Sequence, residues 1–400
     1  MLTILIFILL LGLLVFVHEM GHFLVARYNG IKADEFGFGF PPRLIGIVKD
    51  DQTGRYRVVF GNRDVRSTHT VYSINWIPLG GFVKIKGEDA AAPGGQDSDS
   101  FAKKPARIRI LVLAAGVLMN FLLAWVLISI VFMLGIPEPI DEQDLAQHPD
   151  ARIQILEIVP QSVAQEIGLK PGDILERLDG QDVRSLDQVS GFVAAHRGQE
   201  IRIELNRFGE EMTITGTPKT EVRPGEGALG ISYAFTAKVK HPWYQAIADG
   251  ARATANVTLA IFAALGKMIG GLFGIAEKTP VEITGPVGIV YLTKQMSDLG
   301  FAYLLQFAAL LSINLGIINI LPIPALDGGR ILFVLIEKLK GKPVSERLEG
   351  TIHQIGFALL LLLMLIVTLR DFRPSRSSRA LADFFPKLRS LFLPIVRKSL

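Results

Sequence analysis

The sequence contains no cysteine and carries little net charge. Its 400 residues include 42 Lys and Arg against 38 Asp and Glu, which gives a net charge of +4. Without cysteine, the protein can form no disulfide bond, use no thiolate metal ligand and have no cysteine nucleophile. The modest charge comes with no nucleic-acid-binding motif, and we therefore expect no nucleic acid among its partners.

Apolar residues, in contrast, are abundant. Half of the residues are hydrophobic, and the mean hydropathy is +0.38. Because about 20 apolar residues cross a bilayer, we predict transmembrane helices at residues 1–27, 108–136, 301–335 and 352–370. No basic segment precedes the first run and no small-residue cleavage site follows it, so we expect a retained span and not a signal peptide.

Between the second and third apolar runs the sequence becomes more polar, and apolar and polar residues alternate over short segments. The segments IQILEIVP and EIRIEL alternate as half-buried strands do, and GLKPGDILERLDGQDV mixes turn residues with strand residues. Residues 150–218 are therefore predicted to form an inserted β-rich domain, and residues 219–300 a linker and a membrane-associated amphipathic helix. The predicted fold class is a polytopic α-helical membrane protein with about four transmembrane helices.

Two histidines and a glutamate interrupt the first apolar run, in the segment HEMGH. His18 and His22 share one face of a helix, and Glu19 follows His18. This is the H-E-x-x-H pattern, in which two imidazoles bind zinc and the glutamate is the general base. An ionisable residue within a span costs about 2.5–3.5 kcal/mol on insertion scales and marks function. Histidines that merely hydrogen-bond neighbouring helices would explain neither the glutamate nor the spacing.

A catalytic zinc needs a third protein ligand and an open position. The best candidate is Asp327, in NILPIPALDGGRILF, where Pro322 and Pro324 interrupt an apolar segment. A broken helix at membrane depth is tolerated where it lines a cavity. Asp327 could instead cap the helix that follows, and the two roles can coexist. Imidazole and carboxylate ligands suit Zn²⁺ best, although they are also compatible with iron or cobalt.

The sequence resembles the site-2 protease family of intramembrane zinc metalloproteases, in particular the bacterial RseP type with a PDZ insert. The matching segments follow the family's order along nearly the whole chain: HEMGH at 18–22, FGFGFPP at 36–42, IPLGGFVKIKGE at 77–88, GVLMNFLLA at 116–124, the PDZ-like GLKPGDIL at 168–175, GPVGI at 285–289 and NILPIPALDGGRILF at 319–333. Two features depart from the family pattern. Enterobacterial members have two tandem PDZ domains where one is found here, and the usual Gly-Pro of the second-span motif reads Gly116-Val117.

The resemblance implies a zinc metalloendopeptidase that cleaves transmembrane segments of single-span proteins already trimmed outside, such as anti-sigma factors or remnant signal peptides. This is regulated intramembrane proteolysis, in the bacterial plasma (inner) membrane. The resemblance implies Zn²⁺ at His18, His22 and Asp327, with Glu19 as the catalytic base. It also assigns Asn319 to substrate positioning. Asn314 is either a second positioning residue or a helix–helix contact, because an asparagine in a span needs a partner.

The charge distribution predicts the topology. The loop 28–107 is cytoplasmic by the positive-inside rule, because it carries basic residues that include Arg55, Arg57, Arg63, Arg66, Lys84, Lys86, Lys103, Lys104 and Arg107. The PDZ-like domain is then extracytoplasmic. The histidines and Asp327 meet at one depth only if the first and third spans run in the same direction, so the apolar segment 254–275 is predicted to lie against the membrane. The basic tail 371–400 either binds anionic lipid or follows a fourth run that does not span.

Residues 28–107 are predicted to form a β-hairpin and edge-strand region. EFGFGF places Phe36, Phe38 and Phe40 on one strand face, which would either dip into the membrane beside the zinc or pack on the spans. GFVKIKG is typical of an exposed edge strand, which either pairs with unwound substrate or is a plain cytoplasmic strand.

Three points on function stay open at this stage. The PDZ-like domain either docks trimmed substrates or excludes large ones as a cap. A non-catalytic adaptor is a second function class, against which the intact HEMGH and Asp327 argue. A metal transporter is a third, which fits poorly with the general-base Glu19 and with a soluble peptide-binding insert.

Overall fold

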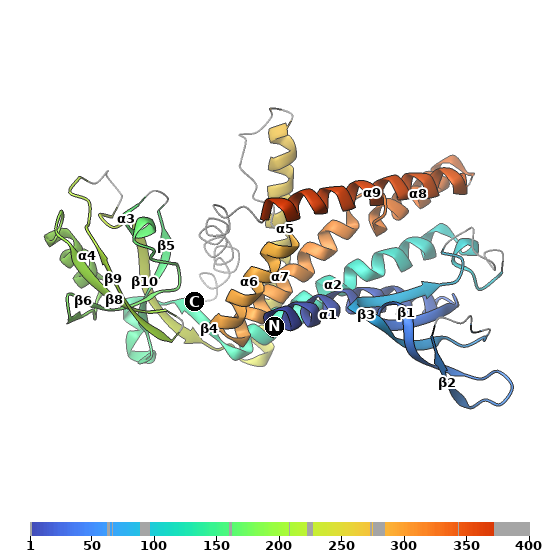
Figure 1. Cartoon of the computed structure of the whole chain (residues 1–400), viewed down its shortest axis with the longest axis horizontal. Helices are drawn as coiled ribbons and strands as arrows, with labels where there is room; N and C mark the ends of the chain where they lie inside the picture. Colours follow the sequence, from blue (N-terminus) through green and yellow to red (C-terminus); the bar gives the residue numbers. More distant parts are fainter. Residues whose placement is uncertain are drawn as a thin grey trace. The chain divides into compact units, whose positions relative to one another are not determined.

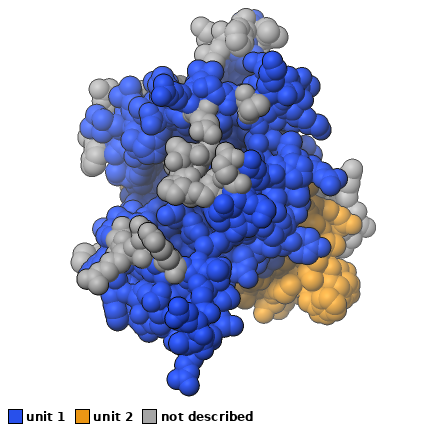
Figure 2. All heavy atoms as spheres, turned by 90° about the vertical axis from the view of Figure 1, so that its right-hand side faces the viewer, with its two compact units in different colours: residues 1–128, 257–294, 304–372 blue, residues 129–256, 295–303, 373–400 orange. Residues whose placement is uncertain are grey.

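The computed structural model describes residues 2–61, 65, 67–88, 97–159, 162–207, 209–221, 227–272, 274, 285–342 and 344–371. The basic tail predicted at 371–400 therefore lies, apart from Asp371, outside the described residues. The chain divides into two compact units, which Figure 2 shows in different colours. Unit 1 comprises Met1–Ile128, Val257–Lys294 and Leu304–Phe372, and the inserted residues Ser129–Asn256 belong to unit 2.

Long apolar helices dominate the chain (Figure 1). Five of the described helices are long and apolar enough to cross a membrane: α1 (Leu2–Tyr28), α2 (Ala106–Leu134), α5 (Trp243–Leu272), α7 (Phe301–Ile320) and α9 (Glu346–Asp371). This is one more than the predicted four, and the additional helix is α5. That α5 lies against the membrane stays a prediction. Together with two β-sheets, these helices fit a membrane protein with an inserted β-rich region.

The predicted span 301–335 consists of two helices, with the break where the two prolines predict it. Helix α7 ends at Ile320, and α8 (Asp327–Lys340) begins at Asp327. The break follows from Pro322 and Pro324, because proline has no backbone N–H to continue a helical ladder. A preceding short helix, α6 (Pro286–Leu299), leads into α7. The break is what places Asp327 at a helix start.

The region after α1 forms a three-stranded antiparallel sheet in the order β2-β1-β3, with β1 at Ala33–Lys49, β2 at Tyr56–Phe60 and β3 at Val71–Ile85. The two ends of β3 pair with the same part of β1, since residues 35–38 pair with residues 71–74 and also with residues 81–84. The aromatic face of EFGFGF turns towards α1. Phe36 stacks on Phe23 with ring centroids 4.4 Å apart, and Phe38 lies 6.0 Å from Phe16. Phe40 is exposed.

Unit 2 contains a seven-stranded antiparallel sheet in the order β4-β10-β5-β6-β8-β9, with β7 paired to β6. Two short helices accompany it, α3 (Val163–Glu166) and α4 (Leu186–Ala195). The strands are Ile136–Pro139 (β4), Arg152–Ile158 (β5), Ile174–Leu178 (β6), Gln181–Asp182 (β7), Ile201–Arg207 (β8), Glu210–Gly216 (β9) and Ile231–Val239 (β10).

The predicted boundaries of this domain, 150–218, are too narrow. Strand β10 lies beyond them and pairs with β5 over Ile231–Thr236, and β4 pairs in turn with β10. Leu229 and Phe235 are buried in the same core as Ile155 and Leu205. Polar residues between β9 and β10 hide this continuity in the sequence, because the pairing partner of β10 is more than 70 residues away along the chain.

One buried ion pair ties the turn before β6 to the sheet of unit 2. The carboxylate of Asp173 accepts hydrogen bonds from Arg207 Nε and Nη2, both at 2.7 Å, and from the backbone N–H of Lys170 at 2.8 Å. The Asp173 side chain is fully buried. Removing one partner of such a pair leaves a buried charge unpaired, which costs about 3–5 kcal/mol.

We therefore expect Asp173→Ala to lower the free energy of unfolding of unit 2 by about 3 kcal/mol. Hydrogen–deuterium exchange of β6 and β8 should then speed up by about a hundredfold, which corresponds to that free energy. Asp182→Ala is the matched control, because its ion pair with Arg184 is exposed and contributes less than about 1 kcal/mol. Equal exchange in the two variants would contradict a role for the buried pair.

Candidate metal centre

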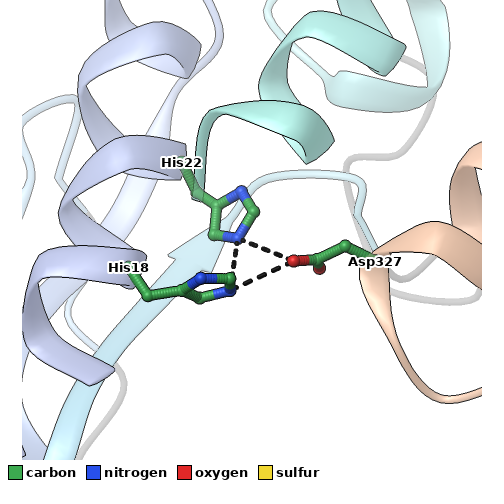
Figure 3. A group of neighbouring side chains, drawn as sticks. All are labelled: His18, His22 and Asp327. Carbon is green, nitrogen blue, oxygen red and sulfur yellow. Dashed lines mark hydrogen bonds and ion pairs between the residues drawn. The ribbon is translucent and has the colours of Figure 1, made fainter. Parts of the chain in front are cut away.

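Two turns of α1 and the start of α8 bring three metal-ligating side chains together (Figure 3). Asp327 Oδ2 lies 3.1 Å from His18 Nε2 and 3.4 Å from His22 Nε2, and the two Nε2 atoms are 3.2 Å apart. Both histidines are buried, and Asp327 is half-buried. Within the described ranges this is the one group of three or more such residues close enough to share a metal ion.

The helix α2 orients the two imidazole rings. His22 Nδ1 donates a hydrogen bond to the backbone oxygen of Val112 at 2.8 Å, so that its Nε2 carries the lone pair that faces Asp327. His18 Nδ1 lies 3.1 Å from the side-chain amide of Asn120, which is fully buried. The amide oxygen of Asn120 has no hydrogen-bond partner in the described residues, and turning the amide over would let it accept from His18 Nδ1–H.

The donor set fits a zinc ion. Ligands about 2.0–2.1 Å from zinc at the corners of a tetrahedron lie about 3.3–3.4 Å from one another, and the three separations here are 3.1, 3.2 and 3.4 Å. With Nδ1 of His22 as a donor, lone pairs converge on one point beside a buried carboxylate oxygen. Converging lone pairs repel unless a cation lies between them. Three protein ligands leave a fourth position open, as in catalytic sites.

Gly116 of α2 provides the space for both rings. A Cβ atom there would lie 2.3 Å from His22 Nε2 and 2.8 Å from His18 Cε1, which is closer than real Cβ contacts come. Any side chain at this position must therefore push the ligand rings away.

We expect Gly116→Ala to weaken zinc binding by about 10–100-fold, the range for changes to groups that orient ligands. Chelator competition on the purified protein measures this. Gly266→Ala in α5 is the matched control, because a Cβ there meets no described atom within 4 Å. Wild-type zinc retention by Gly116→Ala would show that the rings are not confined by α2.

Comparison with known proteins decides the family. The model of peptidase family M50 matches residues 6–363, which is most of the chain and includes all three ligands. The chain belongs to peptidase family M50. The M50 chain is 31% identical to the zinc metalloprotease RasP of Geobacillus kaustophilus, over 91% of this chain and 96% of that protein.

Two further relatives of this M50 chain are equally similar. It is 32% identical to the regulator of sigma-W protease RasP of Bacillus subtilis, over 92% of this chain and 98% of that protein. It is also 32% identical to a putative zinc metalloprotease of Agrobacterium fabrum, over 91% of this chain and 94% of that protein. The resemblance noted in the sequence, the class of zinc metallopeptidase and the Zn²⁺ cofactor are thereby confirmed.

The M50 peptidase places Glu19 beside the ligands. Glu19 directly follows His18 in α1 and is half-buried. Strand β3 passes close to it, since a Cβ on Gly81 would lie 3.2 Å from Glu19 Cβ. The candidate base Glu19 therefore lies near both the ligand His18, which it follows in α1, and a segment of β3.

Asn314 and Asn319 lie on α7 of the M50 peptidase and are half-buried. Within the described residues, no hydrogen bond joins either asparagine to the three ligands. Sequence reasoning missed Asn120, the asparagine that does contact a ligand. A signal was present, because Asn120 is a polar residue within a predicted span and within the family segment GVLMNFLLA. Ser312 of α7 donates a hydrogen bond to the backbone oxygen of Asn120 at 2.8 Å and so ties α7 to α2.

Proposed function

We propose that the protein is an intramembrane zinc protease that cleaves transmembrane segments of single-span membrane proteins. The observation that carries the proposal is the meeting of His18, His22 and Asp327 between apolar helices that are long enough to span a membrane. A soluble peptidase would not require its metal centre to lie between membrane-spanning helices. One relative bears the name regulator of sigma-W protease, which supports substrates of the anti-sigma factor type, and remnant signal peptides are the second substrate type.

Each side chain of the site has a separate role in the proposed reaction. His18, His22 and Asp327 hold the metal. When bound, zinc acts as a Lewis acid that activates a water molecule and polarises the scissile carbonyl. Glu19 accepts the proton of the attacking water on its carboxylate and delivers it to the leaving amine nitrogen, which is general acid–base catalysis by one group. Asn120 and the carbonyl of Val112 keep the rings in the orientation that turns Nε2 inwards.

A peptide bond inside a helix is shielded, so the substrate must unwind before it is cut. Residues 81–85 of β3 support strand addition as the route. They pair with β1 on one side, and Gly81 lies against Glu19. A substrate strand added on the other side of this segment would run past the general base. Asn319 and Asn314 are proposed to position that strand from α7.

Unit 2 is proposed to be a PDZ-like docking module for substrates already trimmed outside. Strand β4 pairs with β10 over Thr236–Val239, which leaves residues 231–234 of β10 without a neighbour on that edge in the described pairing. The hydroxyl of Tyr233 donates to the backbone oxygen of Leu186 on α4 at 3.2 Å, so α4 borders this edge. This arrangement supports peptide addition between β10 and α4. A size-excluding cap remains the alternative role.

The ligand geometry also supports the proposed topology in the bacterial plasma membrane. His18 and His22 lie late in α1, and Asp327 follows α7, so their meeting requires α1 and α7 to run in the same direction. A single membrane crossing by α5, between α2 and α7, would reverse the direction of α7, so we propose that α5 does not cross. With the basic loop 28–107 in the cytoplasm, unit 2 is extracytoplasmic.

Reconstitution with single-span substrates tests this function. A substrate with a trimmed extracytoplasmic part and a longer version of it are compared, and mass spectrometry locates the cuts. We expect the trimmed form to be cut within its apolar segment and the longer form to be cut more slowly. Cuts confined to residues outside the apolar segment would contradict intramembrane proteolysis. Equal cutting of both forms would remove the docking and cap roles of unit 2 but leave the protease.

A further inference from the structure

The metal ligand Asp327 follows a six-residue loop, 321–326, whose backbone is unusual at one position. Ala325 has φ of +75°, in the left-handed region that residues other than glycine rarely adopt. Asp327 lies only two residues further on. The direction in which its carboxylate points therefore depends on what holds Ala325.

The backbone N–H groups of this loop can all be accounted for. Pro322 and Pro324 have none. Three of the others bond locally: Leu321 to Ile318 O at 3.2 Å, Ile323 to Leu321 O at 2.7 Å, and Leu326 to Ile323 O at 3.2 Å. The N–H of Ala325 is the one that reaches beyond the loop and the adjoining end of α7, and it donates to His353 Nδ1 on α9 at 2.7 Å. Among the described residues, His353 is thus the one acceptor for this loop that comes from a distant segment of the chain.

Helix α9 packs closely against the loop, which fixes the position of His353 relative to the Ala325 N–H. A Cβ on Gly356, one turn after His353, would lie 2.5 Å from Pro324 Cβ and 2.9 Å from its backbone oxygen. The His353 ring also contacts the Phe333 ring, with centroids 5.4 Å apart, and its side chain is 18% exposed. The ring is therefore held by its contact with Phe333 while its Nδ1 faces Ala325.

The other end of the metal-binding segment is fixed independently. Arg330 on α8 pairs with Glu88 in the turn after β3, and Glu337 pairs with Arg109 of α2 at 2.7 Å. A Cβ on Gly328 would lie 2.2 Å from the backbone oxygen of Ile320, so the loop folds tightly over the end of α7. With α8 anchored by these pairs, the loop before Asp327 is the part whose conformation is set by α9.

We propose that His353 is a positioning residue, which fixes the Ala325 N–H and thereby aims the Asp327 carboxylate at the metal. This rests on the metal role of Asp327 given in the proposed function. Sequence reasoning assigned α9 no role beyond crossing the membrane. This bond links α9 to the metal centre, although no hydrogen bond or ion pair joins the described residues of α9 directly to the three ligands.

The test compares zinc retention against a chelator and the steady-state kinetics of purified full-length variants. His353→Phe keeps a planar ring but has no acceptor, and His353→Leu is a second variant without an acceptor in case the first does not fold. His353→Asn restores an oxygen near the place of Nδ1. Gln354→Ala is the matched control, because Gln354 is the exposed neighbour on α9.

We expect His353→Phe and His353→Leu to lose zinc at a chelator concentration about tenfold lower than wild type, within the 10–100-fold range for groups that orient metal ligands. kcat should fall by a similar factor at unchanged KM. His353→Asn should recover most of both, and Gln354→Ala should behave as wild type.

Two results would overturn the proposal. One is wild-type zinc retention by the variants without an acceptor. The other is an equal loss in His353→Asn and His353→Phe, which would assign the effect to packing of the ring. Zinc retention requires no substrate, so this result stands even if the wild-type protein cleaves no transmembrane segment, which is how failure of the proposed function would show.

Discussion

Glu19→Gln should retain zinc and lose cleavage. The three ligands are untouched by this change, and the amide has nearly the shape of the carboxylate, so the metal content should equal that of wild type. The amide cannot accept a proton from water or pass one to the leaving amine. General acid–base catalysis contributes about 10²–10⁴-fold, and kcat should fall by that factor.

The measurement is kcat on a single-span substrate together with zinc content on the same preparation. Glu157→Gln, in an exposed position on β5, is the matched control and should leave both quantities unchanged. Loss of zinc in Glu19→Gln would mean that Glu19 supports the ligands and is not the base. Turnover at the wild-type rate would remove the catalytic role altogether.

The second large effect is expected at Asp327. Asp327→Asn preserves the size of the side chain but removes the charge that neutralises the cation and replaces one carboxylate oxygen by a donor. Only His18 and His22 would remain as full ligands. Zinc affinity should fall by more than the roughly 10–100-fold seen when groups around the ligands are changed.

Competition with a chelator measures that affinity, and cleavage should be lost in parallel and recover in part at high zinc concentration. Asp187→Asn, exposed at the start of α4, is the control and should bind zinc as wild type does. Unchanged affinity in Asp327→Asn would show that a different residue completes the site. The same experiment with Glu19→Gln separates metal binding from proton transfer.

The candidate ligands could be proposed from the sequence because short local patterns, namely residue spacing and proline positions, identify them. The four-residue spacing of His18 and His22 fixes a shared helix face, and two prolines before Asp327 mark a helix break. The pairing of α1 with α8 is different, since more than 300 residues separate Asp327 from His18. The need for a third ligand and the proline-broken apolar segment made Asp327 the candidate, and the family resemblance implied the same residue, but spacing alone could not show that the two helices meet.

Other features depended on contacts between distant segments. Asn120 looks like any polar residue in a span until α2 lies against His18. Strand β10 could not be joined to the predicted β-rich domain 150–218, because its register with β5 is set by packing in a common core. His353 reads as one polar residue at the edge of an apolar run, and only the fold shows that it accepts the Ala325 N–H. In each case the sequence does not show which distant strand, ring or backbone group the residue or strand contacts in the fold.

The central claim is that a zinc ion held by His18, His22 and Asp327 serves proteolysis within a transmembrane segment. Cleavage of a tagged single-span substrate by the purified protein in detergent tests it most directly, with wild type beside Glu19→Gln, with and without a zinc chelator. We predict cuts within the apolar segment by wild type alone, abolished by the chelator and restored by added zinc. Cleavage that survives chelation, or that Glu19→Gln performs as well as wild type, would contradict the account.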